Sequence, residues 1–182
     1  MVDLETLGNT PGCGLVSIGA CTFGPGGVQD REQAFYSVVD ARSCLDAGLH
    51  EDASTLAWWA RQSAEAQAAF VQSRKAGEAP SLKVSLGLFT AWLKKQGFYN
   101  TIKVWGNGSD FDNAILACAW RAVGVKPPWA FWHNRCFRTL KAAYTDFGTL
   151  PERKGTHHNA LDDALYQAEC AVVIIKHLRI QW

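Results

Sequence analysis

The opening segment MVDLETLGNTPGCGLVSIGACTF (residues 1–23) decides the fold class. It contains two runs of strand-forming residues, 1–5 and 15–23, separated by the turn-rich GNTPG (residues 8–12). A third such run, residues 33–39, follows a second glycine-rich turn. Three strands joined by connections this short predict an antiparallel meander.

The rest of the chain is dominated by helical spacing of apolar residues. We expect a helix capped by Ser54 or Thr55 that continues to Phe70, and then a helix capped by Ser81 and ended by Gly97. The later elements expected are a strand at 102–105 and helices ending near 122, at 136–144 and at 159–178. A meander followed by alternating helices and strands predicts an α/β fold with a sheet of mixed direction, in a single domain of residues 1–182.

Composition narrows the functional classes. The net charge of +1 excludes a strongly basic nucleic-acid coat protein, although a nuclease needs little bulk charge. The six cysteines are scattered without a CxxC pair, which indicates reduced thiols and neither a disulfide framework nor a zinc site. Because no basic leader and no apolar run of membrane-spanning length occurs, we expect a cytoplasmic protein with no membrane partner.

One stretch is locally basic. Residues 121–145 contain five basic side chains and no acidic residue, and they include Trp129, Phe131 and Trp132. Basic residues interleaved with aromatics suit single-stranded nucleic acid. A solvated rim over a tryptophan-rich core explains the same composition, and composition alone favours that reading.

Asp3 and Glu5 form the first group of candidate catalytic residues. Side chains alternate along a strand, so these two carboxylates share one face, while Val2 and Leu4 share the other. Two carboxylates side by side are costly unless a cation neutralises them, and a divalent metal commonly does so. The pair also precedes a turn, at the strand end where α/β sheets bind ligands.

Two aspartates near the start of a predicted helix differ in their helical phase. At about 100° per residue, Asp112 falls on the apolar side with Ile115 and Leu116. Asp110 falls on the opposite side with Arg121, where it caps the helix or faces solvent. A carboxylate on the inner face needs a partner, so Asp112 is the candidate.

The same argument applies to the HNALDDA segment (residues 158–164). Asp163 shares a largely apolar line with Cys170, whereas Asp162 shares a polar line with Glu169 and is expected at the surface. His158 precedes Asp163 by five residues and would lie about 140° away on a helix. It must therefore lie in the preceding loop and fold back over the site, where a neutral imidazole can act as a general base.

Taken together, three segments resemble the motifs of the DEDDh 3′–5′ exonucleases. DLETLG (residues 3–8) resembles the first motif, NGSDFD (107–112) the second and HNALDDA (158–164) the third, with the histidine spacing of that subclass. The resemblance is greatest to small phage-encoded exonucleases and a related mycobacterial exoribonuclease, through TLAWWARQ (55–62), VWGNG (104–108) and FRTL (137–140).

The resemblance implies a ribonuclease H-like fold and a two-metal-ion hydrolase that releases nucleoside monophosphates from a 3′ end. Two Mg²⁺ or Mn²⁺ ions would be held by Asp3, Glu5, Asp112 and Asp163, with His158 as general base. The substrate-binding residues it suggests are Thr6, Leu7 as a wedge against the terminal base, Trp58, Arg61, Asn107 and Arg138. Helical phase agrees in part, because it separates Trp58 and Arg61 from Trp59, which is expected in the core.

Several alternatives stay open at this point. The phage-type resemblance favours single-stranded DNA as substrate. Oligoribonuclease-like trimming of RNA stays open, because the choice depends on how tightly the pocket packs around the terminal 2′ position. A non-catalytic nucleic-acid-binding module of the same fold is a rival from another class, and a Mg²⁺-dependent phosphatase is a second rival. The oligomeric state stays open as well, with a homodimer as one alternative.

Overall fold

The central element of the structure is a twisted sheet flanked by helices. The computed structural model describes residues 1–97, 101–144 and 148–181. Strands β1 (Val2–Thr6), β2 (Leu15–Ala20) and β5 (Phe35–Val38) form an antiparallel sheet in the order β1-β2-β5. Strands β6 (Val104–Gly106) and β7 (Asn134–Cys136) pair in parallel, with β6 beside β1. The expected meander and mixed sheet are therefore confirmed.

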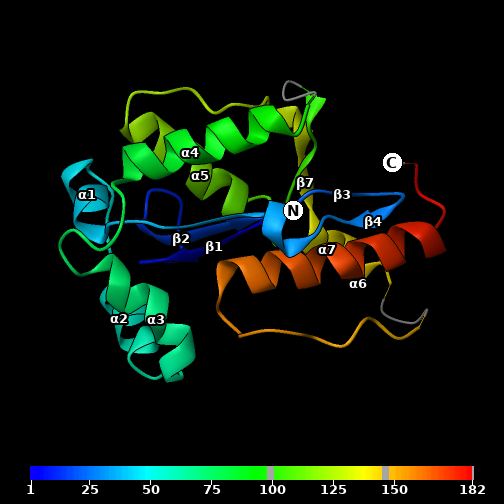
Figure 1. The fold of residues 1–182 in the computed structure, drawn as a ribbon, viewed down its shortest axis with the longest axis horizontal. Helices are drawn as coiled ribbons and strands as arrows, with labels where there is room; N and C mark the ends of the chain where they lie inside the picture. The colour runs from blue at the N-terminus through cyan, green and yellow to red at the C-terminus, as the bar shows by residue number, and fades with distance from the viewer. Residues whose placement is uncertain (98–100, 145–147, 182) are drawn as a thin grey trace.

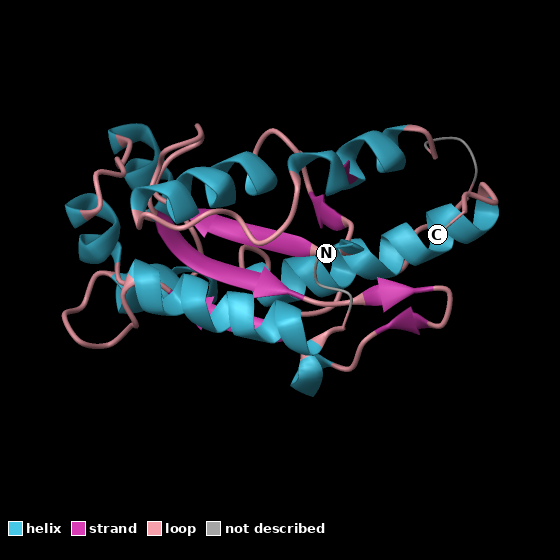
Figure 2. Cartoon of the chain, turned by 90° about the horizontal axis from the view of Figure 1, so that it is seen from above, coloured by secondary structure: helices cyan, strands magenta, loops and turns pink. Residues whose placement is uncertain are grey.

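Helices cover both faces of this sheet (Figures 1 and 2). Helices α4 and α5 lie on one face, α7 lies on the other, and α2 and α3 lie near one end. Of the helices within the described ranges, none is both long enough and apolar enough to cross a membrane. The helices are α1 (Ala41–Asp46), α2 (Ala53–Trp59), α3 (Ala64–Ser73), α4 (Leu82–Lys95), α5 (Asp112–Ala122), α6 (Phe137–Ala142) and α7 (Ala160–His177).

Some elements differ from the sequence-based expectation. The helix expected from residue 54 to 70 is split into α2 and α3, because the Ser63 hydroxyl accepts a hydrogen bond from the Ala66 amide and caps a new helix. The run expected as one strand to residue 23 ends at Ala20. It is followed by a small hairpin of β3 (Phe23–Gly24) and β4 (Gly27–Val28), and a 3₁₀ turn, η1 (Arg31–Gln33).

One glycine allows the last helix to reach the site. A Cβ atom on Gly19 of β2 would lie 2.2 Å from the backbone carbonyl of Ala160, a distance that no side chain tolerates. Glycine at this position therefore lets the first turn of α7 pack directly on the sheet. This packing brings α7 alongside β1, where Asp3 and Glu5 lie.

Candidate active site

Strand β1 carries two buried carboxylates. Asp3 is 8% exposed and Glu5 is 7% exposed, and the Gln167 amide of α7 donates a hydrogen bond to Asp3 Oδ1 at 2.7 Å. Burial, Asp112 and Glu5 together raise the pKa of Asp3 well above its usual range. Burial and the neighbouring Asp112 raise the pKa of Glu5 to about 8. In both groups, burial and the neighbouring carboxylates disfavour ionisation more strongly than the charge of Arg153 favours it.

Asp112 begins helix α5 and is only 1% exposed. Its Oδ1 accepts a hydrogen bond from the Leu4 amide at 3.2 Å, whereas its buried Oδ2 has no hydrogen-bond partner among the described residues. Burial raises the pKa of Asp112 to about 7. Asp112 therefore lies on the inner face as expected, and Asp110 is exposed as expected.

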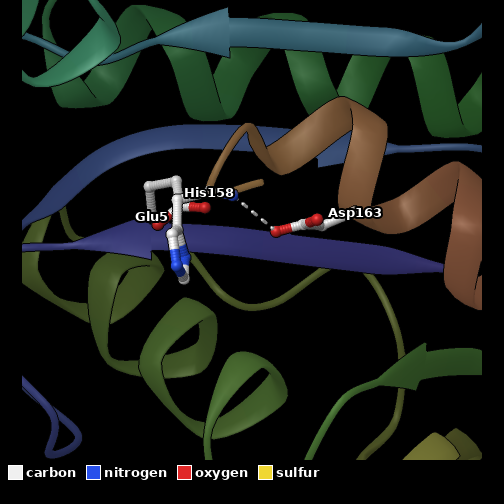
Figure 3. Close-up of side chains that lie close together, drawn as sticks. All are labelled: Glu5, His158 and Asp163. Carbon is white, nitrogen blue, oxygen red and sulfur yellow. Dashed lines mark hydrogen bonds between the residues drawn. The ribbon is translucent and has the colours of Figure 1, made fainter. Parts of the chain in front are cut away.

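The third group comes from the loop before α7 and the first turn of that helix (Figure 3). One ligand atom from each of Glu5, His158 and Asp163 lies within 4.8 Å of the other two. The His158 amide also donates a hydrogen bond to Asp163 Oδ2 at 3.2 Å. Burial lowers the pKa of His158 from 6.5, helped by His157 and Arg153, so its imidazole is neutral at pH 7.

The first and third groups line a cleft of about 650 Å³, whereas Asp112 is buried and is not among its lining residues. Trp58 packs edge-on against the His158 ring at a centroid distance of 4.7 Å. Trp59 is buried, as expected, and its indole donates a hydrogen bond to the Thr6 carbonyl at 2.9 Å. The cleft wall includes Asp3, Glu5, Thr6, Trp58, Arg61, Asn107, Arg153, His158 and Asp163.

Two substrate-binding candidates lie elsewhere. Leu7 is fully buried in a core cluster with Val16 and Trp59, so the expectation that it wedges against a terminal base is wrong. Arg138 is exposed and does not belong to the cleft wall that the described residues form. It lies close by, because its guanidinium donates a hydrogen bond at 2.8 Å to the carbonyl of Asn107, which does line the cleft.

Helical phase also predicted the wrong environment for Asp162. It is only 8% exposed, because the segment before α7 and the side chain of Arg31 cover it. The Arg31 guanidinium pairs with Asp162 Oδ1, and the Thr156 amide donates a hydrogen bond to Oδ2 at 2.7 Å. The expectation of a surface position fails because the polar line of an isolated helix becomes buried when a loop folds over it.

Arg153 is a site residue that the sequence-based reasoning missed. Its guanidinium pairs with Asp163 Oδ1 and lies 5.0 Å from the centroid of the Tyr166 ring. This cation offsets part of the negative charge of the carboxylates. The surrounding loop has no periodic pattern, so the sequence holds no signal that places Arg153 in the cleft.

The donors present fit a divalent cation. All four carboxylates are buried, and Asp112 Oδ2 lacks a hydrogen-bond partner among the described residues. Arg153 pairs with Asp163, and the charge of Arg138 acts on Asp112 and lowers its pKa, yet two positive charges leave four carboxylates under-neutralised. Hard oxygen donors of this kind favour Mg²⁺ or Mn²⁺ over softer metals.

The raised carboxylate pKa values predict how the stability of the metal-free protein depends on pH. In the unfolded chain these groups lose their protons near their ordinary pKa values of 3.8 and 4.5, whereas folded Asp112 and Glu5 keep theirs until about 7 and 8. The folded state therefore binds more protons across this window, and the free energy of unfolding should fall as pH rises through it. Thermal unfolding in EDTA at a series of pH values measures this slope.

The matched variants for this experiment are Asp112→Asn and Asp110→Asn. The first removes a buried charge and should flatten the fall in melting temperature, whereas the second changes an exposed group and should leave the slope as in the wild type. Because the pKa of His158 is lowered, His158 makes the free energy of unfolding rise with pH below pH 6.5, which is a slope of opposite sign. This contribution is the same in both variants. An unchanged slope in Asp112→Asn would contradict the assignment of a buried, uncompensated carboxylate.

Comparisons with known proteins agree with this geometry. The chain shares its fold with the crystal structure of cell-death related nuclease 4 (CRN-4), with a TM-score of 0.66 and 13% sequence identity. That alignment covers 97% of this chain and 62% of the nuclease chain, so this chain spans less than two thirds of that protein. No curated protein sequence matches the chain significantly. The family model described as a 3′–5′ exoribonuclease Rv2179c-like domain matches residues 1–175, and the chain therefore belongs to the Rv2179c-like 3′–5′ exoribonuclease domain family.

Proposed function

We propose that the chain is a metal-dependent 3′–5′ exonuclease that hydrolyses single-stranded nucleic acid to nucleoside monophosphates. The observation that carries the proposal is the convergence of Asp3, Glu5, Asp112 and Asp163, from three distant segments, beside His158. Membership of an exoribonuclease domain family supports it. The raised pKa values of Asp3, Glu5 and Asp112 mean that these buried groups cost stability, which favours a catalytic site over a non-catalytic binding module.

Asp3, Glu5, Asp112 and Asp163 would hold Mg²⁺ or Mn²⁺ through their oxygens. When bound, divalent ions neutralise the carboxylates, polarise a phosphodiester and lower the pKa of water. Arg153 pairs with Asp163 in this structure and supplies one further positive charge beside the carboxylates. Asp3 is oriented by Gln167, and Asp112 by the Leu4 amide, so both are fixed by the fold.

His158 is assigned the role of general base. A ring nitrogen must be free of a proton to accept one from the attacking water, and burial keeps the imidazole neutral at pH 7. Trp58 packs edge-on against the ring and fixes one side of it. The proton therefore passes from water to an imidazole that faces Glu5 and Asp163 across the cleft.

The cleft wall suits the end of a single strand. Its volume of about 650 Å³ is that of a small-molecule pocket, which takes a strand end and not a long duplex. The Trp58 ring offers an aromatic surface for a base, and Arg61 offers a positive charge for a phosphate. These two residues are the proposed substrate contacts, together with Asn107, which also lines the cleft.

The test uses oligonucleotides labelled at one end. With Mg²⁺ or Mn²⁺, a 3′-labelled strand should release its label at once as a mononucleotide, whereas a 5′-labelled strand should shorten stepwise. Excess EDTA should stop both reactions. Release of inorganic phosphate alone would favour the phosphatase alternative, and degradation that persists in EDTA would contradict the proposal.

The preference between DNA and RNA is tested with the same assay. The phage-type resemblance of the sequence favours DNA, and the description of the family favours RNA, which makes RNA the second candidate substrate. Matched DNA and RNA oligonucleotides of one sequence separate these candidates through the ratio of their kcat/KM values. The 2′-hydroxyl of the terminal nucleotide is the group that the cleft must accept or reject.

A further inference from the structure

Asp162, the neighbour of a proposed metal ligand, uses both of its carboxylate oxygens to hold other segments of the chain. Oδ2 accepts a hydrogen bond from the Thr156 amide at 2.7 Å, and Oδ1 pairs with the guanidinium of Arg31. The Asp162 side chain is 9% exposed, while that of Arg31 is 54% exposed. A buried carboxylate with a charged partner and a backbone amide is well satisfied, so Asp162 needs no metal of its own.

The loop before α7 lies directly on this carboxylate. Gly155 adopts a φ of +80°, and a Cβ atom at this position would lie 2.4 Å from Asp162 Cγ. Only glycine permits this approach at this backbone angle. We call residues 155–158 the histidine loop, and the start of this loop is therefore held against the first turn of α7.

The end of the histidine loop is held by the next residue along the helix. The His158 amide donates a hydrogen bond to Asp163 Oδ2 at 3.2 Å. His158 has a φ of +61°, a left-handed conformation that is uncommon outside glycine and that persists where neighbouring contacts enforce it. Two adjacent aspartates thus fix the loop at both ends. Asp163, as a proposed metal ligand, is expected to exchange its contacts when a metal binds.

From this arrangement, we propose that Asp162 and Arg31 form a clamp that positions His158 over the cleft. The proposal rests on the proposed role of His158 as general base. Arg31 comes from η1, between β4 and β5, and neutralises Asp162 so that its other oxygen can hold the Thr156 amide. Asp162 and Arg31 are positioning residues, because neither lines the cleft formed by the described residues.

The direct test is a graded series of variants. Arg31→Gln removes the ion pair at an exposed side chain, Asp162→Asn keeps one neutral acceptor for the Thr156 amide, and Asp162→Ala removes both contacts. A misplaced catalytic group can cost about 10²-fold in rate. We therefore expect kcat to fall about 10- to 100-fold, with the loss increasing in the order Arg31→Gln, Asp162→Asn, Asp162→Ala. KM should stay nearly unchanged, and hydrogen exchange at the Thr156 amide should accelerate in the same order.

Arg42 and Asp46 provide a matched control. They form an ion pair of 2.9 Å on α1, far from the histidine loop in the sequence. Arg42→Gln and Asp46→Asn should leave kcat and Thr156 exchange at wild-type values. If Arg31→Gln behaves like Arg42→Gln in both measurements, the clamp is overturned.

Combining these variants with His158→Ala separates positioning from general damage to the fold. In the His158→Ala background, Arg31→Gln should cause no further loss of kcat, because the group that it positions is gone. An equal fold-loss in both backgrounds would overturn the clamp. Mn²⁺ affinity, measured by calorimetry without substrate, should be the same in Arg31→Gln as in the wild type. A parallel loss of Mn²⁺ affinity would overturn the clamp by assigning the effect to Asp163.

The same data distinguish failure of the clamp from failure of the proposed function. If His158→Ala turns over at the wild-type rate, the general base is wrongly assigned and the clamp falls with it. If His158→Ala is impaired while Arg31→Gln and Asp162→Asn are not, only the clamp is wrong.

Discussion

Asp112→Asn should remove turnover almost completely while the protein stays folded. The substitution keeps the size of the side chain and its acceptor for the Leu4 amide, but it removes the charge from a buried oxygen that has no other partner among the described residues. Since the loss affects the proposed metal site itself, we expect it to exceed the roughly 10²–10⁴-fold that a general base contributes. Single-turnover cleavage of a 5′-labelled oligonucleotide measures this loss.

Asp110→Asn is the control for this prediction. Asp110 lies two residues earlier and is exposed, so its variant should keep most of the wild-type rate and bind Mn²⁺ with wild-type affinity. Asp112→Asn should bind Mn²⁺ more weakly. If Asp110→Asn reduces turnover as much as Asp112→Asn, the position of Asp112 on the inner face of α5 does not explain the loss of turnover.

His158→Ala should reduce kcat by about 10²–10⁴-fold, the usual contribution of a general base. Metal affinity and KM should change little, because the four carboxylates that would hold the metal remain. Burial lowers the pKa of His158, so the wild-type rate at saturating metal should stay high below pH 6.5 and fall only when the imidazole is protonated. In His158→Ala this fall in rate at acid pH, the acid limb of the profile, should disappear.

His157→Ala is the matched control for the histidine. His157 is the more exposed of the two neighbouring imidazoles, and we expect its loss to cost much less. Carboxylates also release metal as pH falls, so each pH requires its own metal titration. Full recovery of the wild-type rate at about pH 5.5 by added Mn²⁺ would assign the acid limb to metal loss and contradict the role of His158.

The helical spacing of apolar residues predicted the position of Asp112, whose helix has one apolar face and one polar face. Asp112 was correctly placed because Ile115 and Leu116 on the same face are buried, so the helical phase defines an inner side. The meander was equally readable, because its three strands are separated by clear turns. The prediction that His158 lies before the helix is confirmed by the start of α7 at Ala160.

The features that could not be predicted depend on contacts between distant segments. Asp162 is buried by Arg31, 131 residues away in the sequence, and the phase of one helix carries no information about such a partner. Arg153 lies in an irregular loop, and Leu7 is buried by packing against Trp59 and its neighbours. Strand β7 has only three residues, which is too short for an alternating pattern to identify.

We propose that Asp3, Glu5, Asp112 and Asp163 form one divalent metal centre. Anomalous diffraction at the manganese edge, from crystals grown with Mn²⁺ and a nucleoside monophosphate, tests this assignment. We expect anomalous peaks between these carboxylates at about 2.0–2.6 Å from their oxygens, the range for hard divalent ions, with Arg153 displaced from Asp163. Crystals in which Mn²⁺ binds elsewhere while Arg153 remains paired with Asp163 would contradict it.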